Sequence, residues 1–262
     1  IMDASLWIAK TGLTAQQTRM QVISNNLANV NTTGFKKDRA VFEDLLYQNI
    51  VPAGGQTDAQ SQAPTGLMLG TGTRVLATEK LHGQGNVINT ENALDVAITG
   101  EGFLSVSQPD GTIAYTRDGS LKLSATGQLV TAGGQTIQPA ITIPQNAESI
   151  TIARNGIVTA QIANGGGSSQ VGQINLSLFV NNSGLKPIGR NLYASTEASG
   201  VAINGLPGEN GAGILMQGSL EASNVNVVEE MVNMIETQRA YEVSSKSITA
   251  ADEMMRYISN NL

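Results

Sequence analysis

The feature that most constrains the fold is a regular spacing of apolar residues over residues 223–262. From Val227 onwards, positions that alternate four and three residues apart are mostly apolar or aromatic. A 3.5-residue period keeps one stripe of a helix facing a partner helix along its length. Glu229 and Glu230 fall in the expected first turn, where the helix dipole favours negative charge, and no glycine or proline interrupts the run. The pattern predicts a long C-terminal helix that packs through a coiled-coil seam.

The N-terminal residues repeat this spacing. Between Leu6 and Val30, apolar residues alternate three and four positions apart, and Gln16 is the one polar member. The helix is expected to end before Gly34, among Asn and Thr residues that favour turns. Two helices of one period predict that the ends of the chain pair as a coiled coil. The predicted seam positions are Leu6, Leu13, Met20, Ile23, Leu27, Val30, Val227, Met231, Met234, Tyr241, Ile248, Met255 and Leu262.

The C-terminal helix carries a second apolar edge beside this seam, formed by Val228, Val232 and Ile235. A helix with two apolar edges is expected to contact more than one neighbour, although an ordinary core helix is the alternative interpretation. Six of the eight methionines lie in the two terminal segments, and their flexible side chains suit surfaces that fit several neighbours. Asn224 or Asn226 is expected to cap the start of the helix.

Between the helices, from about residue 73 to residue 195, apolar and polar residues alternate with a period of two. Turn sequences such as Pro109-Asp110-Gly111 and Asn155-Gly156 separate the short runs. Regular short spacing of this kind predicts an antiparallel sandwich or barrel. The chain is therefore predicted to be α+β, with paired terminal helices and an inserted, mainly antiparallel β domain. The candidate strands are 74–78, 94–98, 103–107, 113–116, 120–124, 128–131, 136–143, 149–153, 156–162 and 171–179.

Residues 48–72 differ from the rest because they show no periodicity and are rich in Gly, Gln, Ala, Pro, Thr and Ser. A long stretch of this composition predicts disorder or a specialised binding loop. The glycines of residues 66–72 superficially resemble a phosphate loop. No Gly-Lys-Ser/Thr sequence and no clear strand accompany them, which argues against a nucleotide site.

Composition restricts the possible partners and chemistry. The chain has 15 basic and 21 acidic residues, a net charge of −6 without long blocks of one sign, which argues against nucleic acid and anionic membranes. There is no cysteine, and the lone His82 is expected in a loop or packing role, so no metal, cofactor or catalytic residue is predicted. Asp110 and Asp118 fit Asp-Gly turns better than acid catalysis. The N-terminus lacks the features of a cleavable signal peptide, and no stretch is apolar for long enough to span a bilayer.

Two motifs, one near each end, indicate a family. Residues 24–36, SNNLANVNTTGFK, closely resemble the N-terminal signature of the bacterial flagellar rod and hook proteins. Residues 223–232, SNVNVVEEMV, followed by QRAYE at 238–242, resemble the matching C-terminal signature. Residues 95–103 and 115–119 are similar to the β core that this family shares. The resemblance covers essentially the whole chain.

The resemblance implies a structural, self-assembling homo-oligomer rather than an enzyme. It implies three domains: a helical one of residues 1–32 and 223–262, an intermediate one of 33–75 and 210–222 with a long extended segment, and an outer β domain of 76–209. The long segment 48–72 is similar to the distal-rod type of the family, whereas in the hook type this stretch is shorter. A rigid, hollow helical tube that transmits torque from the motor to the hook is the implied function.

The implied location is the flagellar basal body, from the periplasm to the outer membrane. The implied partners are proximal-rod proteins, hook or hook-junction proteins, ring proteins of the peptidoglycan and outer membrane, and the type III exporter, with no direct membrane insertion. The extended segment is expected to lie between subunits, anchored by Tyr47, Ile50, Leu67, Met68 and Leu69. The alternatives are a hook or proximal-rod subunit and, from another class, an extracellular β-sandwich hydrolase or adhesin, which predicts saturable ligand binding by residues 76–209.

Overall fold

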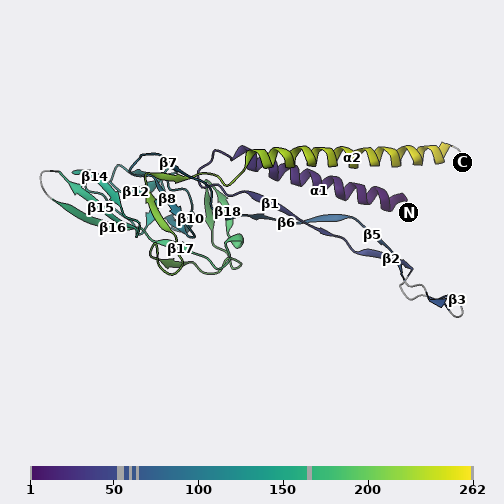
Figure 1. Ribbon diagram of the computed structural model, residues 1–262, viewed down its shortest axis with the longest axis horizontal. Coiled ribbons are helices and arrows are strands. Elements are labelled where there is room, and N and C mark those ends of the chain that lie inside the picture. Colours follow the sequence, from purple (N-terminus) through teal and green to yellow (C-terminus); the bar gives the residue numbers. More distant parts are fainter. Residues whose placement is uncertain (1, 52–55, 59–60, 63–64, 164–166, 261–262) are drawn as a thin grey trace. The chain divides into compact units, whose positions relative to one another are not determined.

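The computed structural model describes residues 2–51, 56–58, 61–62, 65–163 and 167–260 (Figure 1). Two compact units make up the chain. The helix–ribbon unit comprises Ile1–Leu27, Asp38–Glu79 and Val227–Leu262, and the β unit comprises Ala28–Lys37 and Lys80–Asn226. The chain thus passes between the units four times, after residues 27, 37, 79 and 226. The three-part division expected for the assembled protein stays a prediction.

Both predicted terminal helices are present in the helix–ribbon unit. Helix α1 spans Met2–Ala28 and helix α2 spans Val227–Asn260. They lie side by side and run in opposite directions, since Asn26 contacts Glu230 while Arg19 contacts Glu236 (Figure 1). Neither helix, over its described residues, has an apolar stretch sufficient to cross a membrane. These contacts establish an antiparallel pair, whereas packing as a continuous coiled coil stays a prediction.

The rest of the helix–ribbon unit, in its described residues, is a two-stranded ribbon. Strand β1 (Asp38–Asp44) pairs with β6 (Thr73–Lys80), β2 (Tyr47–Val51) with β5 (Leu67–Gly70), and β3 (Gln56–Asp58) with β4 (Ser61–Gln62). The expectation that residues 48–72 lack regular structure is therefore wrong for the described part of that segment. Strand pairing satisfies backbone N–H and C=O groups whatever the side chains are, so an aperiodic composition does not prevent it.

The β unit is built on a nine-stranded sheet with the order β11-β12-β13-β9-β10-β19-β18, in which β17 pairs with both β9 and β20. The β unit also contains a three-stranded sheet, β14-β15-β16, and the strand pairs β8–β21 and β7–β22. The named strands of this unit pair antiparallel, as predicted, and an isolated bridge between Glu101 and Ala212 is parallel. The bounds are β7 Val87–Asn89, β8 Val96–Thr99, β9 Phe103–Ser107, β10 Ile113–Thr116, β11 Leu121–Leu123, β12 Leu129–Thr131, β13 Thr136–Gln138, β14 Ala147–Ile152, β15 Ile157–Ile162, β16 Ser168–Gln173, β17 Leu176–Leu178, β18 Lys186–Gly189, β19 Leu192–Ala194, β20 Ile203–Gly205, β21 Ile214–Gln217 and β22 Ser219–Glu221, with a 3-10 turn at Asn182–Gly184.

The large sheet has apolar side chains on both faces. On β9, Leu104 belongs to an aliphatic cluster with residues such as Leu129, Ile137 and Leu215, whereas Phe103 belongs to an aromatic cluster. Successive residues of a strand point to opposite faces, which explains this division. The aromatic cluster comprises Phe103, Tyr115, Phe179, Leu185 and Tyr193. The β unit is therefore held by two apolar clusters, one on each face of the sheet.

Several strand boundaries differ from the sequence-based predictions. The strand expected over 136–143 ends at Gln138, because Pro139 has no N–H to donate to a ladder. The strand expected over 171–179 is divided between β16 and β17. Residues 196–222, which contain none of the candidate strands given above, contain β20, β21 and β22. These strands have three or four residues each, too few for a period of two to be recognised.

Candidate assembly surfaces and a buried junction

The predicted helical seam is only partly buried in the single chain. Ile23 on α1 is buried, and Ile248 and Met255 on α2 are half-buried. Val227 and Met231, by contrast, are exposed, Met231 by 52%. Leu262 lies outside the described residues. Most of the other seam positions are half-buried, so the seam is only partly covered within the chain, and its role in assembly stays a prediction.

The face of α2 that is most deeply buried carries polar residues, Glu230 and Thr237. Thr237 is satisfied locally, because its hydroxyl donates to the carbonyl of Asn233 at 2.7 Å. Glu230 accepts a hydrogen bond at 3.3 Å from the Nδ2 of Asn26 on α1. The Nδ2 of Asn26 also donates to the carbonyl of Asp38 at 2.9 Å, while its Oδ1 accepts from the Asp38 amide at 2.8 Å. Asn26, quoted above only as part of a motif, therefore joins α1, α2 and β1.

The second apolar edge of α2 is exposed over its whole length. Val228 is 71% exposed, and Val232 and Ile235 are also exposed. Contiguous exposed apolar side chains on a folded chain mark surfaces that bind another molecule. That α2 contacts more than one neighbour stays a prediction.

The predicted anchor residues of the extended segment lie on the paired strands β2 and β5. Tyr47, Ile50, Leu67, Met68 and Leu69 are exposed, Met68 by 54%. Asn49 pairs with Met68 and Gln48 with Leu69, so neighbouring rungs of the ribbon point their side chains to opposite faces. Both faces of this part of the ribbon consequently present apolar side chains to solvent in the single chain.

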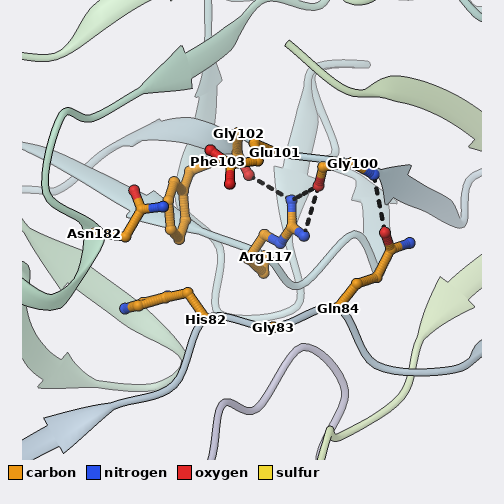
Figure 2. A pocket seen from close by; sticks show the side chains of 9 residues that line it. All are labelled: His82, Gly83, Gln84, Gly100, Glu101, Gly102, Phe103, Arg117 and Asn182. Atoms are coloured by element: carbon orange, nitrogen blue, oxygen red, sulfur yellow. Dashed lines mark hydrogen bonds between the residues drawn. The ribbon is translucent and has the colours of Figure 1, made fainter. Parts of the chain in front are cut away.

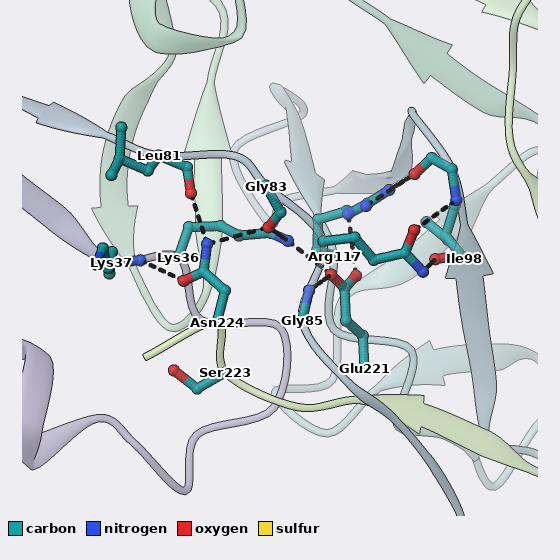
Figure 3. A network of polar contacts seen from close by, with 12 residues as sticks. Lys36, Lys37, Leu81, Gly83, Gly85, Ile98, Arg117, Glu221, Ser223 and Asn224 are labelled. Carbon is teal, nitrogen blue, oxygen red and sulfur yellow. Dashed lines mark hydrogen bonds and ion pairs between the residues drawn. The ribbon is translucent and has the colours of Figure 1, made fainter. Parts of the chain in front are cut away.

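A buried ionic cluster lies in the β unit (Figure 3). The Glu221 carboxylate accepts from the Lys36 Nζ at 2.6 Å, and its second oxygen lies 3.1 Å from the Nε of Arg117. That second contact is an ion pair by distance but is too misaligned to be a hydrogen bond. All three side chains are excluded from solvent. Burial lowers the pKa of Lys36 and of Arg117, and the charge of Glu221 opposes this lowering in both.

Arg117 and Gly34 fix the surrounding backbone. The Arg117 guanidinium donates to the carbonyls of Gly100 and Gly102 at 2.7–2.9 Å. Gly34, in the N-terminal motif, has φ +67°, and a Cβ there would lie 2.8 Å from the backbone of Arg117. Only glycine tolerates both conditions without strain. The motif glycine thus allows residues 28–37 to lie close to the Arg117 backbone within the β unit.

Asn224, one of the two residues predicted to cap α2, does not cap the helix. Its Oδ1 accepts from the Lys37 amide at 2.7 Å, and its Nδ2 donates to the carbonyls of Leu81 and Gly83 at 2.8 and 3.0 Å (Figure 3). The side chain is therefore committed to segments far away in the sequence. No local signal could have predicted this, because a motif asparagine before a helix looks like a cap.

A cavity of about 220 Å³ adjoins the cluster and is lined by His82, Gln84, Glu101, Phe103 and Arg117, among others (Figure 2). The His82 ring packs edge-on against Phe103 and Tyr193, which agrees with the expected packing role. No group of three or more His, Asp or Glu side chains in the described part of the chain is arranged to hold a metal ion.

Three segments of the chain match known families. Residues 6–36 match the family described as flagella basal body rod protein, and residues 216–262 match the flagellar basal body rod FlgEFG protein C-terminal family. Residues 97–160 match the D1 domain of flagellar hook protein FlgE/F/G. The matched segments include both terminal motifs and much of the β unit.

Full-length relatives agree with these matches. The flagellar basal-body rod protein FlgG of Buchnera aphidicola subsp. Acyrthosiphon pisum is 55% identical over 258 residues, covering 98% of this chain and 99% of the relative. The proteins of the same name from Borreliella burgdorferi and Bacillus subtilis are 48% and 38% identical, and the alignments cover at least 99% of each chain. The family is one of structural rod and hook proteins rather than enzymes. Identity of this extent over the full length means that the chain belongs to the family of flagellar basal-body rod proteins.

Proposed function

We propose that this chain is a structural subunit of the flagellar distal rod, which self-assembles into a rigid helical tube and transmits motor torque to the hook. The observation that carries the proposal is its identity over the full length with basal-body rod proteins named FlgG. The chemistry of the chain fits this role, because many large apolar side chains are exposed on its helices and ribbon.

The helices are the first surface for self-assembly. Val227 of the seam and Val228 of the second edge are successive residues, so their side chains lie about 100° apart around α2, and both are exposed in the single chain. Burying both would require at least two neighbouring helices, which a helical tube supplies. Within the tube, residues 1–32 and 223–262 would pair as a coiled coil in the inner layer, with 33–75 and 210–222 outside them and 76–209 outermost.

The ribbon is the second surface. Its apolar side chains on both faces can be removed from water only if other chains cover both faces, and each large side chain so buried contributes about 1.5–3 kcal/mol. A coiled-coil tube bends when neighbouring subunits slide past one another. A ribbon that lies across adjacent subunits would oppose this sliding. We therefore assign to Tyr47, Ile50, Leu67, Met68 and Leu69 the role of locking the tube straight.

The partners follow from this assignment. A distal rod joins proximal-rod proteins at one end and hook or hook-junction proteins at the other, and it turns inside ring proteins of the peptidoglycan layer and the outer membrane. Its place is the flagellar basal body, across the periplasm, and its subunits reach that place through the flagellar type III exporter.

Electron microscopy of the purified full-length chain, together with complementation, tests the proposal. We expect straight tubes to form as the protein concentration rises, and we expect the gene to restore motility to a cell that lacks its own distal rod. Val228→Asp should abolish tubes while the circular dichroism spectrum stays that of the folded chain. The control is Thr249→Asp, which places the same charge at an exposed polar position of α2. A folded chain that neither forms tubes nor restores motility would overturn the proposal.

A further inference from the structure

The linker that follows α1 and the linker that precedes α2 are bonded to each other inside the β unit. The amide of Gly34, after α1, donates to the carbonyl of Glu221 at 2.8 Å. The Lys36 Nζ contacts the Glu221 carboxylate at 2.6 Å, and the Lys37 amide donates to the Asn224 side chain at 2.7 Å. Residues 34–37 and 221–224 are thus joined by backbone bonds, a buried ion pair and a side-chain amide.

A third segment, residues 81–85, is bonded to both linkers (Figure 3). The Gly83 carbonyl accepts from Lys36 at 2.8 Å and from Asn224 at 3.0 Å. The Gly85 amide donates to the Glu221 carboxylate at 2.9 Å. A Cβ on Gly85 would lie 2.0 Å from the carbonyl oxygen of Ala222, so this approach requires glycine. We call residues 34–37, 81–85 and 221–224 with their mutual bonds the linker latch.

His82 lies in the middle of segment 81–85. Its ring lies near that of Phe103 (Figure 2), and its ring centroid is 5.6 Å from those of Phe103 and Tyr193. Both ring nitrogens are buried without a well-aligned hydrogen-bond partner among the described residues. This environment suits a neutral imidazole. Protonation turns both nitrogens into donors, and among the groups around the ring the Asn182 backbone is the acceptor that favours this charged form.

The charges around His82 also oppose protonation. Lys36 of the first linker, Lys80 at the end of β6 and Arg117 after β10 all act on it as cations. The acidic groups nearby are the carboxylates of Glu101, which lines the same cavity, and Glu221, which already contacts two of these cations. The Tyr193 phenol is the remaining titratable group against the ring. A charged imidazole would therefore meet three cations in a buried site.

We infer that His82 makes the linker latch sensitive to acid. A neutral ring holds segment 81–85 in place, whereas a charged ring must reach solvent and withdraws this segment from both linkers. The hydrogen bonds of Gly83 with Lys36 and Asn224, and that of Gly85 with Glu221, would then break. In acid, the residues beside both helices would be released from the rest of the β unit.

The pH range follows from the His82 environment. Burial lowers the pKa of His82 from 6.5 to about 4; Lys36, Arg117 and Lys80 add to this lowering, and the Asn182 backbone opposes it. Above pH 6.5 both folded and unfolded chains hold the neutral ring, so the latch has its full stability. Between pH 6.5 and 4 the unfolded chain binds the proton first, so stability falls as the pH falls. Near pH 4 the folded chain binds the proton too and the latch opens.

Nuclear magnetic resonance of the full-length chain tests this inference, because His82 is the single histidine. We expect the imidazole signals to titrate near pH 4 rather than 6.5. At the same midpoint, amide protection factors of residues 34–37, 81–85 and 221–224 should fall at least tenfold, while those of β9 and β10 stay unchanged. Titration near 6.5, or linker protection that does not change when the ring titrates, would overturn the inference.

Two variants separate His82 from the carboxylates that titrate in the same range. His82→Phe keeps a ring that cannot be charged, so linker protection should persist through pH 4. Glu221→Gln should lower linker protection tenfold or more even at pH 7, which shows that these amides report the latch. Loss of protection in His82→Phe at the wild-type midpoint would assign the effect to carboxylates. If His82→Phe fails to fold, the wild-type chain decides whether His82 opens the latch. The inference stands if the imidazole titration and the loss of linker protection have the same midpoint, and it fails if the midpoints differ.

Discussion

Asn26 on α1 and Glu230 on α2 are 204 positions apart in the chain, and their side chains meet in a buried hydrogen bond of 3.3 Å. They are 2% and 3% exposed, respectively. The same Asn26 side chain bonds both backbone groups of Asp38 at the start of the ribbon. One buried amide therefore fixes how three elements of the helix–ribbon unit meet.

We expect Asn26→Ala to destabilise the helix–ribbon unit by about 2–4 kcal/mol. The variant loses hydrogen bonds to the buried Glu230 carboxylate and to both backbone groups of the half-buried Asp38, and each buried polar group that loses its bond costs about 1–3 kcal/mol. Urea unfolding of assembled rods, followed by the circular dichroism of the helices, measures the effect. The neighbouring Asn25→Ala is the control, because Asn25 is exposed and its bond to the Asp38 carboxylate is worth about 0.5 kcal/mol. Equal effects of the two changes would contradict the assigned role of Asn26.

Ile248→Asp should prevent rod assembly. Ile248 is a half-buried seam position, and an unpaired carboxylate on a buried stripe costs several kcal/mol unless it reaches water. Motility and the number of rods in electron micrographs measure the effect. Thr249→Asp, one residue further at an exposed position, should assemble normally. Normal motility of Ile248→Asp cells would mean that the seam lies on another face of α2.

Met68→Asp should change the rod but not the single chain. Since Met68 is 54% exposed on the ribbon, the free energy of unfolding of the monomer should change by less than about 0.5 kcal/mol. Rods should become curved or flexible, because a charge would occupy the proposed contact between subunits. Met68→Leu, which keeps an apolar side chain of similar size, is the control.

Deletion of residues 50–65 should make the rods more curved or flexible than Met68→Asp does. Export of the chain and the fold of the β unit should stay intact. Micrographs of purified rods give the curvature directly. Straight and equally stiff rods from the deletion would refute the locking role and favour a hook-like subunit.

In the monomer, the helices and the β unit should differ in their rates of amide hydrogen exchange. The helices expose two apolar edges, and α1 and α2 can pair only after closure of a large loop, which costs entropy. We therefore expect fast amide exchange in α1 and α2 of dilute monomer and slow exchange within residues 94–180, where the aliphatic cluster lies. Strong protection of both helices in a verified monomer would contradict this expectation.

The elements that depend on local spacing were predictable from the sequence. The 3.5-residue period predicted both helices, and the structure places them at Met2–Ala28 and Val227–Asn260. Strands β9 and β10 have the predicted bounds, because a clear alternation ends at a Pro-Asp-Gly turn between them. The terminal motifs also identified the family. In each case the signal lies within a few turns of helix or one hairpin, where neighbours in sequence are neighbours in space.

Only the tertiary structure revealed the ribbon and the linker latch. The pairing of β2 with β5 depends on backbone hydrogen bonds, which leave no pattern in the side chains. Lys36 and Glu221 are 185 positions apart, and as isolated letters they look like surface charges. Asn224 looks like a helix cap until the fold brings Lys37 and Leu81 beside it. A buried polar group takes its partners from whichever segments the packing brings within about 3 Å, and a linear sequence does not contain that distance.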